Sequence, residues 1–469
     1  MTTASDDLIG MLRAEGDFAH VFGYHPFNIE LADAHGIWLQ DTAGRRYIDA
    51  SGGPMAVNIG HGDPRMKAAI AAQLDHFAYC HPMLANRPRA ELAAAIARHT
   101  PPGLSAVYLV SGGSEAVETA LKLARQYWVA EGRPGKHKVV SNFESYHGMT
   151  LATMGLSGNP GVLRAYDPMV PHWPKVPQFS LAGRPDDVTI DDWVDQSLAQ
   201  IERCFHYEGA DTIAAFIATP HGCGSDYGLV APRRYWEGVR ALCDAFDILF
   251  IADEVVTGFG RTGAWFAMEH FGVVPDLMTI AKGMSGCAMP LGGVVVSDRV
   301  RAPFDEGRAY FVHGFTHGGH ALACAAGLAT IRILEEDRLV ESVAAKHERL
   351  FAYRERLLAH PSVADVRGWG LFMVLELVED KASRTYFAPE RGAEQLFQKI
   401  AFENGLAFYS TLYGPRRRPL MSRGLPMWVS PPLIITEAEI DLLIERLDRT
   451  LDIWERTLGL AADARSAAS

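Results

Sequence analysis

From about Ala68 onward the chain alternates helical stretches with short, mostly apolar runs, and this alternation constrains the fold more than any other feature. Each run is followed by Gly, Pro or a small polar residue. Runs of this kind are typical of strands that lie buried in a parallel sheet between layers of helices. The sequence therefore predicts an α/β protein with a large, mostly parallel sheet. The expected strands are Ala106–Val110, Lys138–Asn142, Thr212–Ala218, Ile248–Ala252, Leu277–Ala281 and Gly293–Ser297.

Both ends of the chain depart from this alternation. The segment Gly36–Ala50 alternates apolar and polar residues on either side of Asp41–Gly44, which is typical of a β-hairpin. Beyond residue 336 the pattern predicts a long polar helix, two strand regions and a closing helix. These elements are expected at Asp337–His360, Val363–Glu376, Trp428–Ile435 and Glu437–Glu455.

The length of the chain, 469 residues, is enough for two or three domains. Since the pattern changes near residues 67 and 336, we expect three parts. They are an N-terminal segment at residues 1–67, a large domain at 68–335 and a smaller C-terminal α+β domain at 336–469.

The composition narrows the class of partner. The chain has 44 Lys and Arg against 56 Asp and Glu, and a net charge of −12 would repel a phosphate backbone. Nucleic acids and anionic membranes are therefore not expected partners. No run approaches the ~18 apolar residues of a transmembrane helix, and Met1–Asp17 lacks the features of a secretory signal, which predicts a cytoplasmic protein. The six cysteines are scattered without a C-x-x-C pair, which favours reduced thiols over a metal or redox site.

A glycine-rich turn joins the first predicted strand of the large domain to a helix. Its sequence is Val110-Ser-Gly-Gly-Ser-Glu-Ala-Val117, with Ser114 as the expected N-cap. Glycines permit a close approach of ligand to backbone, and the N–H groups at a helix N-terminus attract phosphate. A tight turn that only caps the helix fits this segment equally well. Neither G-x-G-x-x-G nor a P-loop G-K-[ST] is present in this turn, which argues against dinucleotides and nucleoside triphosphates.

Charged residues follow two of the predicted buried strands. Asp253 and Glu254 come after Phe250–Ala252, and Lys282 comes after Thr279–Ala281. Ligands in open α/β sheets bind beyond the carboxyl ends of the strands. A carboxylate paired in the core and a lysine that reaches the surface are the simpler alternatives. Together, however, a phosphate cradle, an acid that holds a pyridinium nitrogen and a desolvated, imine-forming lysine are the parts that a pyridoxal phosphate (PLP) enzyme needs.

The motifs also stand in the order of a known family. Between about Phe27 and Leu451 the chain resembles the class III PLP-dependent aminotransferases, and within them the ω-amino acid or amine:pyruvate branch. This resemblance implies a fold-type I homodimer or dimer of dimers, with active sites shared between subunits and a small domain built from both chain ends. The matching motifs are Gly60–Pro64, Gly113–Ala116, Ser145–Gly148, Asp253–Val255, Gly258–Gly263, Ala281–Gly283, Thr316, Arg367–Gly368 and Ser430–Leu433.

The resemblance assigns roles to individual residues. Lys282 would form the imine with PLP and later move the substrate proton, and Asp253 would keep the pyridine nitrogen protonated. That positive charge makes the ring an electron sink. The other expected cofactor contacts are Gly113, Ser114 and the partner subunit's Thr316 at the phosphate, Tyr146 and Val255 on the two ring faces, and His147 beside them.

Departures from the family pattern bear on the substrate. Thr219 stands where most members have Glu, and Val256 where glutamate-using members have Gln, which argues against a Glu–Arg switch. Met55 lies near a position where amine-accepting members tend to have Trp, so a wider pocket is expected. Two further substrate contacts are expected, His81 in an interface loop and Arg423 as a carboxylate-binding residue in the unusual insert 413–425.

These observations lead to one principal hypothesis. The protein is expected to move an amino group from an amine or ω-amino acid to pyruvate or a similar 2-oxo acid by a ping-pong mechanism. A PLP-dependent epimerase or lyase on the same scaffold remains an alternative, because relatives of the family carry out both reactions with the same lysine. No metal is expected in either case.

Overall fold

The computed structural model describes residues 29–158, 163, 166–181, 184–221, 228–409 and 425–460. Its centre is a seven-stranded sheet in the order β4-β10-β9-β8-β7-β5-β6. Only β10 runs antiparallel to its neighbours β4 and β9, so the sheet is mostly parallel, as predicted. The strands are β4 Leu104–Val110, β5 Lys138–Asn142, β6 Lys175–Val176, β7 Ile213–Ala218, β8 Leu249–Asp253, β9 Leu277–Ile280 and β10 Gly292–Ser297.

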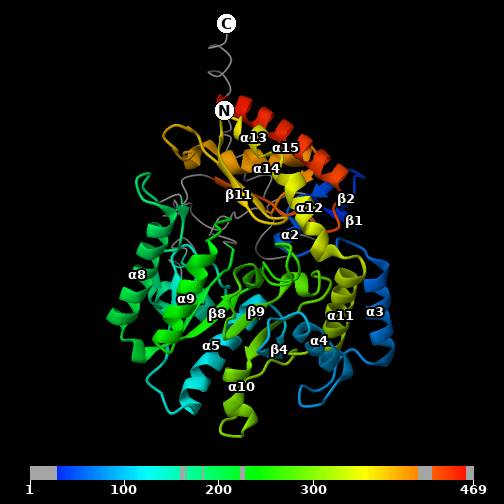
Figure 1. Cartoon of the computed structure of the whole chain (residues 1–469). Helices are drawn as coiled ribbons and strands as arrows, with labels where there is room; N and C mark the ends of the chain where they lie inside the picture. Colours follow the sequence, from blue (N-terminus) through cyan, green and yellow to red (C-terminus); the bar gives the residue numbers. More distant parts are fainter. Residues whose placement is uncertain are drawn as a thin grey trace.

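Helices cover both faces of this sheet, which explains why its central strands are mostly apolar. Every residue of β7 is buried. Because side chains alternate along a strand, Ala215 and Ile217 join the core on one face, while Phe216 and Ala218 join the core on the other. Helix α5 (Gly113–Ala130) packs in the first core, and α8 (Ile190–Glu208) and α9 (Arg233–Ala245) pack in the second (Figure 1).

Further helices of this part surround the sheet. Helix α11 packs against both α3 and α4, and α10 packs against α5. Their bounds are α2 Gly52–Met55, α3 Pro64–His76, α4 Arg87–Ala97, α6 Leu151–Leu156, α10 Asp298–Asp305 and α11 Ala321–Glu336.

Segments from both ends of the chain share a second sheet. The predicted hairpin is present as β2 and β3, and the late strand β13 pairs in parallel with β3, with Leu406 opposite Ile48. Figure 1 shows β1 and β2 beside α15 at one end of the molecule. The elements are β1 Leu31–His35, β2 Trp38–Asp41, β3 Arg46–Asp49, β13 Leu406–Ala407, α14 Ala393–Glu403 and α15 Glu437–Leu458. A separate antiparallel sheet contains β11 Val363–Gly368, β12 Met373–Leu377 and β14 Leu425–Val429.

Three predicted elements differ from the structure. The strand region expected at 363–376 forms two antiparallel strands, β11 and β12, because the chain reverses at Gly368 and Gly370, which have left-handed φ angles. The long helix expected at 337–360 is divided into α12 (Leu339–Phe351) and α13 (Arg354–Leu358). Arg349, in the last turn of α12, and Tyr353, within the break, both donate hydrogen bonds to Asp441 of α15. Helical periodicity does not reveal this tertiary contact. The strand expected at 428–435 instead ends at Val429, because two prolines follow Ser430 and prolines lack the N–H that a strand ladder needs.

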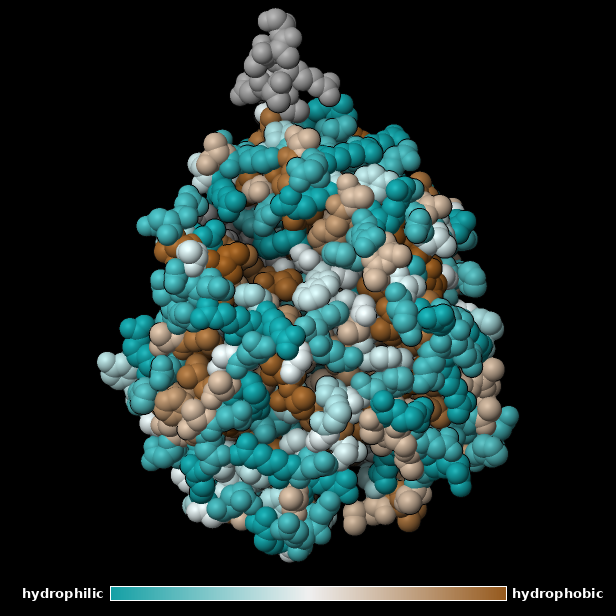
Figure 2. All heavy atoms as spheres, viewed as in Figure 1, coloured by the Kyte–Doolittle hydropathy of each residue, from teal (hydrophilic) through white to brown (hydrophobic). Residues whose placement is uncertain are grey.

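Hydrophilic residues cover most of the face seen in Figure 2, where hydrophobic surface lies in separate patches around a hollowed centre. Among the helices of the described residues, none combines the length and the apolar character that crossing a membrane requires.

Candidate active site

Asp253 is the last residue of β8, and three donors surround its carboxylate. His147 Nδ1 lies 2.7 Å from Asp253 Oδ2, and Oδ1 accepts hydrogen bonds from Thr279 Oγ1 at 2.9 Å and from the backbone N–H of Val255 at 3.1 Å. The residue is only 5% exposed. These three donors fix the carboxylate of Asp253 in one orientation, as a partner for a cationic group on a ligand requires.

Glu254, the next residue, has a structural role. Its carboxylate accepts hydrogen bonds from the Thr257 hydroxyl and from the N–H groups of Ala267 at 3.0 Å and Met268 at 2.8 Å. Burial raises the pKa of Glu254 to about 7, against the effect of these three donors. Asp253 and Glu254 are neighbours in the sequence but have different partners. Asp253 lies at the candidate site, and Glu254 binds the turn of 267–271.

Lys282 lies on a strained turn beside Asp253. It follows β9, the strand next to β8, in which Thr279 pairs with Asp253. Its φ angle of 44° is left-handed, which is uncommon for a residue with a side chain. The carboxyl ends of two adjacent parallel strands thus present a carboxylate and a lysine on the same edge of the sheet, as the sequence predicted.

The glycine-rich turn begins α5 at this same edge. A Cβ atom on Gly113 would lie 3.0 Å from Val255 Cγ1 and 3.8 Å from Ala281 Cβ, so only glycine fits easily between the two strand ends. The prediction that Ser114 is the N-cap was wrong, because Gly112 occupies that position. Ser114 Oγ instead accepts a hydrogen bond from Met149 N–H at 3.1 Å, which ties the helix start to the segment that follows β5. A long helix with a glycine start suits a phosphate.

That segment, Ser145–Gly148, carries Tyr146 and His147. Tyr146 is 42% exposed, whereas His147 is buried and its backbone N–H donates to Ser157 Oγ at 3.0 Å. His147 Nε2 has no hydrogen-bond partner among the described residues. The sequence analysis named His147 but did not foresee its bond to Asp253, since 106 positions separate the two residues and no local pattern reports such a pairing.

The expected substrate residues lie in different surroundings. Met55 is buried in a small apolar cluster with Phe372, Val374 and Trp428, against which Val256 also packs. His81 is exposed, and its Nδ1 accepts a hydrogen bond from Met83 N–H at 3.2 Å. Thr316 is exposed in the loop between α10 and α11. Arg423 lies outside the described residues.

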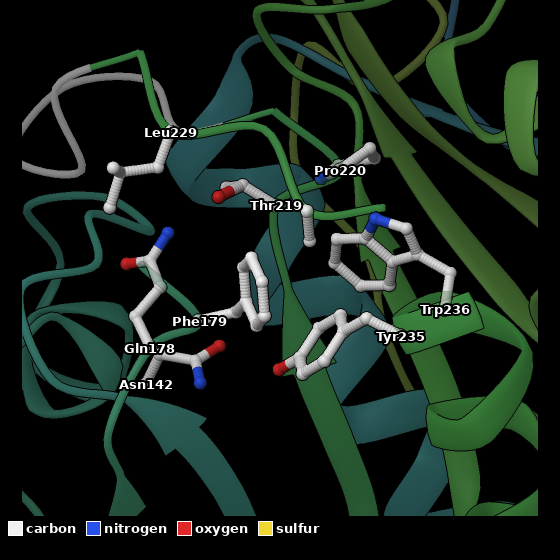
Figure 3. A pocket seen from close by; sticks show the side chains of 9 residues that line it. Asn142, Gln178, Phe179, Thr219, Pro220, Leu229, Tyr235 and Trp236 are labelled. Carbon is white, nitrogen blue, oxygen red and sulfur yellow. The ribbon is translucent and has the colours of Figure 1, made fainter. Parts of the chain in front are cut away.

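Thr219, which follows β7, lines a small pocket with Asn142 from the end of β5 (Figure 3). Figure 3 shows the rings of Phe179, Tyr235 and Trp236 grouped on one side of this pocket. A threonine here supplies a neutral hydroxyl, so the pocket has no carboxylate at the position that the sequence analysis singled out.

Comparisons with known proteins identify the family. Residues 21–451 match the model of the family described as "Aminotransferase class-III". A putrescine–pyruvate aminotransferase of Pseudomonas aeruginosa is 36% identical over 426 residues, which is 90% of each chain. A crystal structure of an (S)-enantioselective ω-transaminase from Thermomicrobium roseum is similar with a TM-score of 0.87 and 33% identity, over 97% of this chain and 99% of that one. An ω-transaminase from Pseudomonas jessenii, solved in complex with PMP, has a TM-score of 0.86 and 30% identity over 94% and 97% of the two chains.

The chain therefore belongs to the class III aminotransferases and has the type I fold of PLP-dependent enzymes. It is an aminotransferase that uses PLP, as members of this family do. The residues at the edge of the sheet fit this cofactor, since they combine a buried carboxylate for a pyridinium nitrogen, a lysine and a glycine-lined helix start.

Proposed function

We propose that this aminotransferase moves the amino group of an amine or ω-amino acid to pyruvate or a similar 2-oxo acid. The observation that carries the proposal is the grouping of Asp253, Lys282 and Gly113 at one edge of the sheet, with Asp253 held by three donors. The name of the putrescine–pyruvate relative supports this choice of donor and acceptor. Thr219 and Val256 support it too, since they replace the residues that glutamate-using members carry.

Each residue has a proposed task. When bound, PLP supplies an electron sink for the charge that develops on the substrate carbon. Asp253 keeps the proton on the pyridine nitrogen, and Lys282 Nζ holds the cofactor and later moves the substrate proton. Gly113 and Ser114 bind the phosphate at the start of α5, with the partner subunit's Thr316. Tyr146 and Val255 contact the two ring faces.

A half-reaction without acceptor tests this proposal. Purified yellow holoenzyme is mixed with a panel of amines and amino acids, and the visible absorption of the bound cofactor is followed. We expect a true donor to bleach the band and pyruvate to restore it, while Lys282→Ala stays inert. If no donor bleaches the band but an amino acid racemises or loses a leaving group, the enzyme is an epimerase or lyase.

The width of the donor pocket is also part of the proposal. Met55 takes the place of the Trp expected in amine-accepting members. It packs beside Val256, the residue after Val255 in the loop that follows β8. Met55→Trp should lower kcat/KM for 1-phenylethylamine by about tenfold or more, because the larger indole ring would fill space that the phenyl group of the donor needs. The rate with isopropylamine serves as the control. Equal losses with both amines would show that Met55 does not limit donor size.

A homodimer, or a dimer of such dimers, with shared active sites completes the proposal. Large apolar side chains are exposed on two loops. Met83 (78%) and Leu84 (58%) lie after α3, and Tyr310 (74%) and Val312 (74%) lie after α10. Exposed apolar groups of this size are typical of protein interfaces. Sedimentation velocity should give a dimer or tetramer, and Thr316→Ala should weaken phosphate binding. A monomer with full activity would contradict the proposal.

We also propose a cytoplasmic location, because the described cysteines Cys80, Cys204, Cys243, Cys287 and Cys324 are all free thiols. Reduced thiols suit that compartment. Fractionation of cells that express the tagged protein would test the location.

A further inference from the structure

Asn58 joins three distant parts of the chain at a fully buried position. Its Nδ2 donates a hydrogen bond to the carbonyl of Phe259 at 2.8 Å, and its Oδ1 accepts one from Arg261 Nη2 at 2.8 Å. Its backbone carbonyl accepts from Leu433 N–H, also at 2.8 Å. The residue is 0% exposed, so the side-chain amide is satisfied by protein groups from the loop after β8 and not by solvent.

The same amide packs directly on the turn that carries Lys282. A Cβ atom on Gly283 would lie 2.3 Å from Asn58 Nδ2 and 2.8 Å from Asn58 Cγ, which means that the amide occupies the space of a side chain there. The next residue along, Ile59, lies in the same way against Gly286, where a Cβ would come within 2.9 Å. Residues 58 and 59 therefore form one wall of the turn.

This wall explains how Lys282 keeps a left-handed backbone. A φ of 44° is costly for a lysine and persists only where surrounding contacts leave no alternative. Two hydrogen bonds lie within the turn, from Met284 N–H to the carbonyl of Ala281 and from Ser285 N–H to the carbonyl of Lys282. They define the local backbone conformation of the turn. They join residues of the turn to one another, whereas Asn58 packs on the turn from outside it.

Arg261 extends the connection to the C-terminal part of the chain. Its Nη1 donates to the carbonyls of Leu371, Ser430 and Pro431, at 3.0, 3.2 and 2.6 Å. Arg261 Nη1 thus binds backbone carbonyls next to β12 and β14, and Arg261 Nη2 binds Asn58. Through Asn58, the position of that region bears on the lysine turn.

We propose that Asn58 is a positioning residue that holds Lys282 in its strained conformation and couples it, through Arg261, to the small antiparallel sheet. This inference rests on the proposed function, in which Lys282 is the lysine that holds PLP. Asn58 itself is proposed to contact neither the substrate nor the reacting atoms. Its effect passes through the backbone of Gly283.

The test compares Asn58→Ala, Asn58→Asp and the control Asn404→Ala as holoenzymes. Asn404 also donates two side-chain hydrogen bonds, to Ile400 and Thr450, but lies on the turn after α14. The first readout is the pH midpoint of the visible absorption change of the cofactor. The second is the melting temperature. Asn58→Ala should shift the midpoint by about one pH unit, because release of backbone strain changes the proton affinity at the lysine nitrogen.

Asn58→Asp loses the donor to the Phe259 carbonyl but keeps the volume against Gly283 and the bond from Arg261, whose charge offsets the new carboxylate. Because the packing against the turn remains, its midpoint should stay near that of the wild type. Asn404→Ala should lower the melting temperature and leave the midpoint unchanged. If Asn58→Ala behaves like Asn404→Ala, Asn58 is only structural and the inference is wrong. If instead Lys282→Ala still shows the lysine-linked absorption, the proposed function has failed, which is a separate result.

Discussion

Asparagine in place of Asp253 tests whether the charge at the end of β8 is what the site requires. The carboxylate accepts from His147 on one oxygen and from Thr279 and Val255 on the other. An asparagine has only one oxygen, so its amide nitrogen must face at least one of these donors. The variant therefore keeps the volume of the side chain but loses both its charge and part of its hydrogen-bond set.

The expected cost follows from these contacts. A hydrogen bond to a charged group contributes about 1.5–3 kcal/mol, and loss of a preorganised electrostatic partner at a reacting centre costs about 3–4 kcal/mol. We therefore expect the rate of the half-reaction to fall by about 10²- to 10³-fold. The rate is measured by stopped-flow absorption after mixing holoenzyme with a saturating amine donor.

Glu254→Gln is the matched control. Glu254 is the neighbouring buried carboxylate, but its partners are Thr257 and the backbone of Ala267 and Met268. Because burial raises the pKa of Glu254 to about 7, a neutral glutamine is a modest change near neutral pH. This variant should lose about 1 kcal/mol of stability and retain most of its rate. If Asp253→Asn binds the cofactor and stays within tenfold of the wild-type rate, the proposed role of Asp253 is refuted.

Two further predictions concern the helix start and the C-terminal part. Gly113→Ala should weaken cofactor retention on dialysis by about tenfold, because the new Cβ would press on Val255 at 3.0 Å, and unchanged retention would argue against a tight cradle. Burial lowers the pKa of His360, but its hydrogen bonds to Glu455 and Asp448, each at 3.0 Å, outweigh this effect and raise it. Because a raised pKa stabilises the fold below the unfolded value of about 6.5 and loses that effect as pH rises through the folded value, His360→Gln should lower the melting temperature more at pH 6 than at pH 9. An equal loss at both pH values would show that His360 does not titrate with folding.

Much of the seven-stranded sheet was predictable because its signals are local. Strand β5 begins and ends at the predicted residues, and the other predicted strands of the sheet differ at their ends by one or two residues. A buried strand needs a continuous apolar run, and a ligand site at strand ends needs charged residues just after it. The placement of Asp253 and Lys282 at strand ends could therefore be predicted from their neighbours along the chain.

Two of the predictions that failed depended on contacts at long range. Gly112, and not Ser114, is the N-cap of α5, since the Ser114 hydroxyl serves Met149 N–H from the segment after β5. The helix expected at 337–360 breaks where α15 supplies Asp441 as an acceptor. In both cases a tertiary partner outweighs a local preference of modest energy.

The sequence by itself determined the class of fold, the order of the strands along the chain and the residues available for PLP chemistry, because periodicity and motif order are properties of neighbours. The tertiary structure alone decided how these residues work together. It placed His147 against Asp253, gave Glu254 a structural task and set Asn58 against the lysine turn. These pairings join residues 14 to 225 positions apart, and only the packing of the folded chain brings such residues into contact.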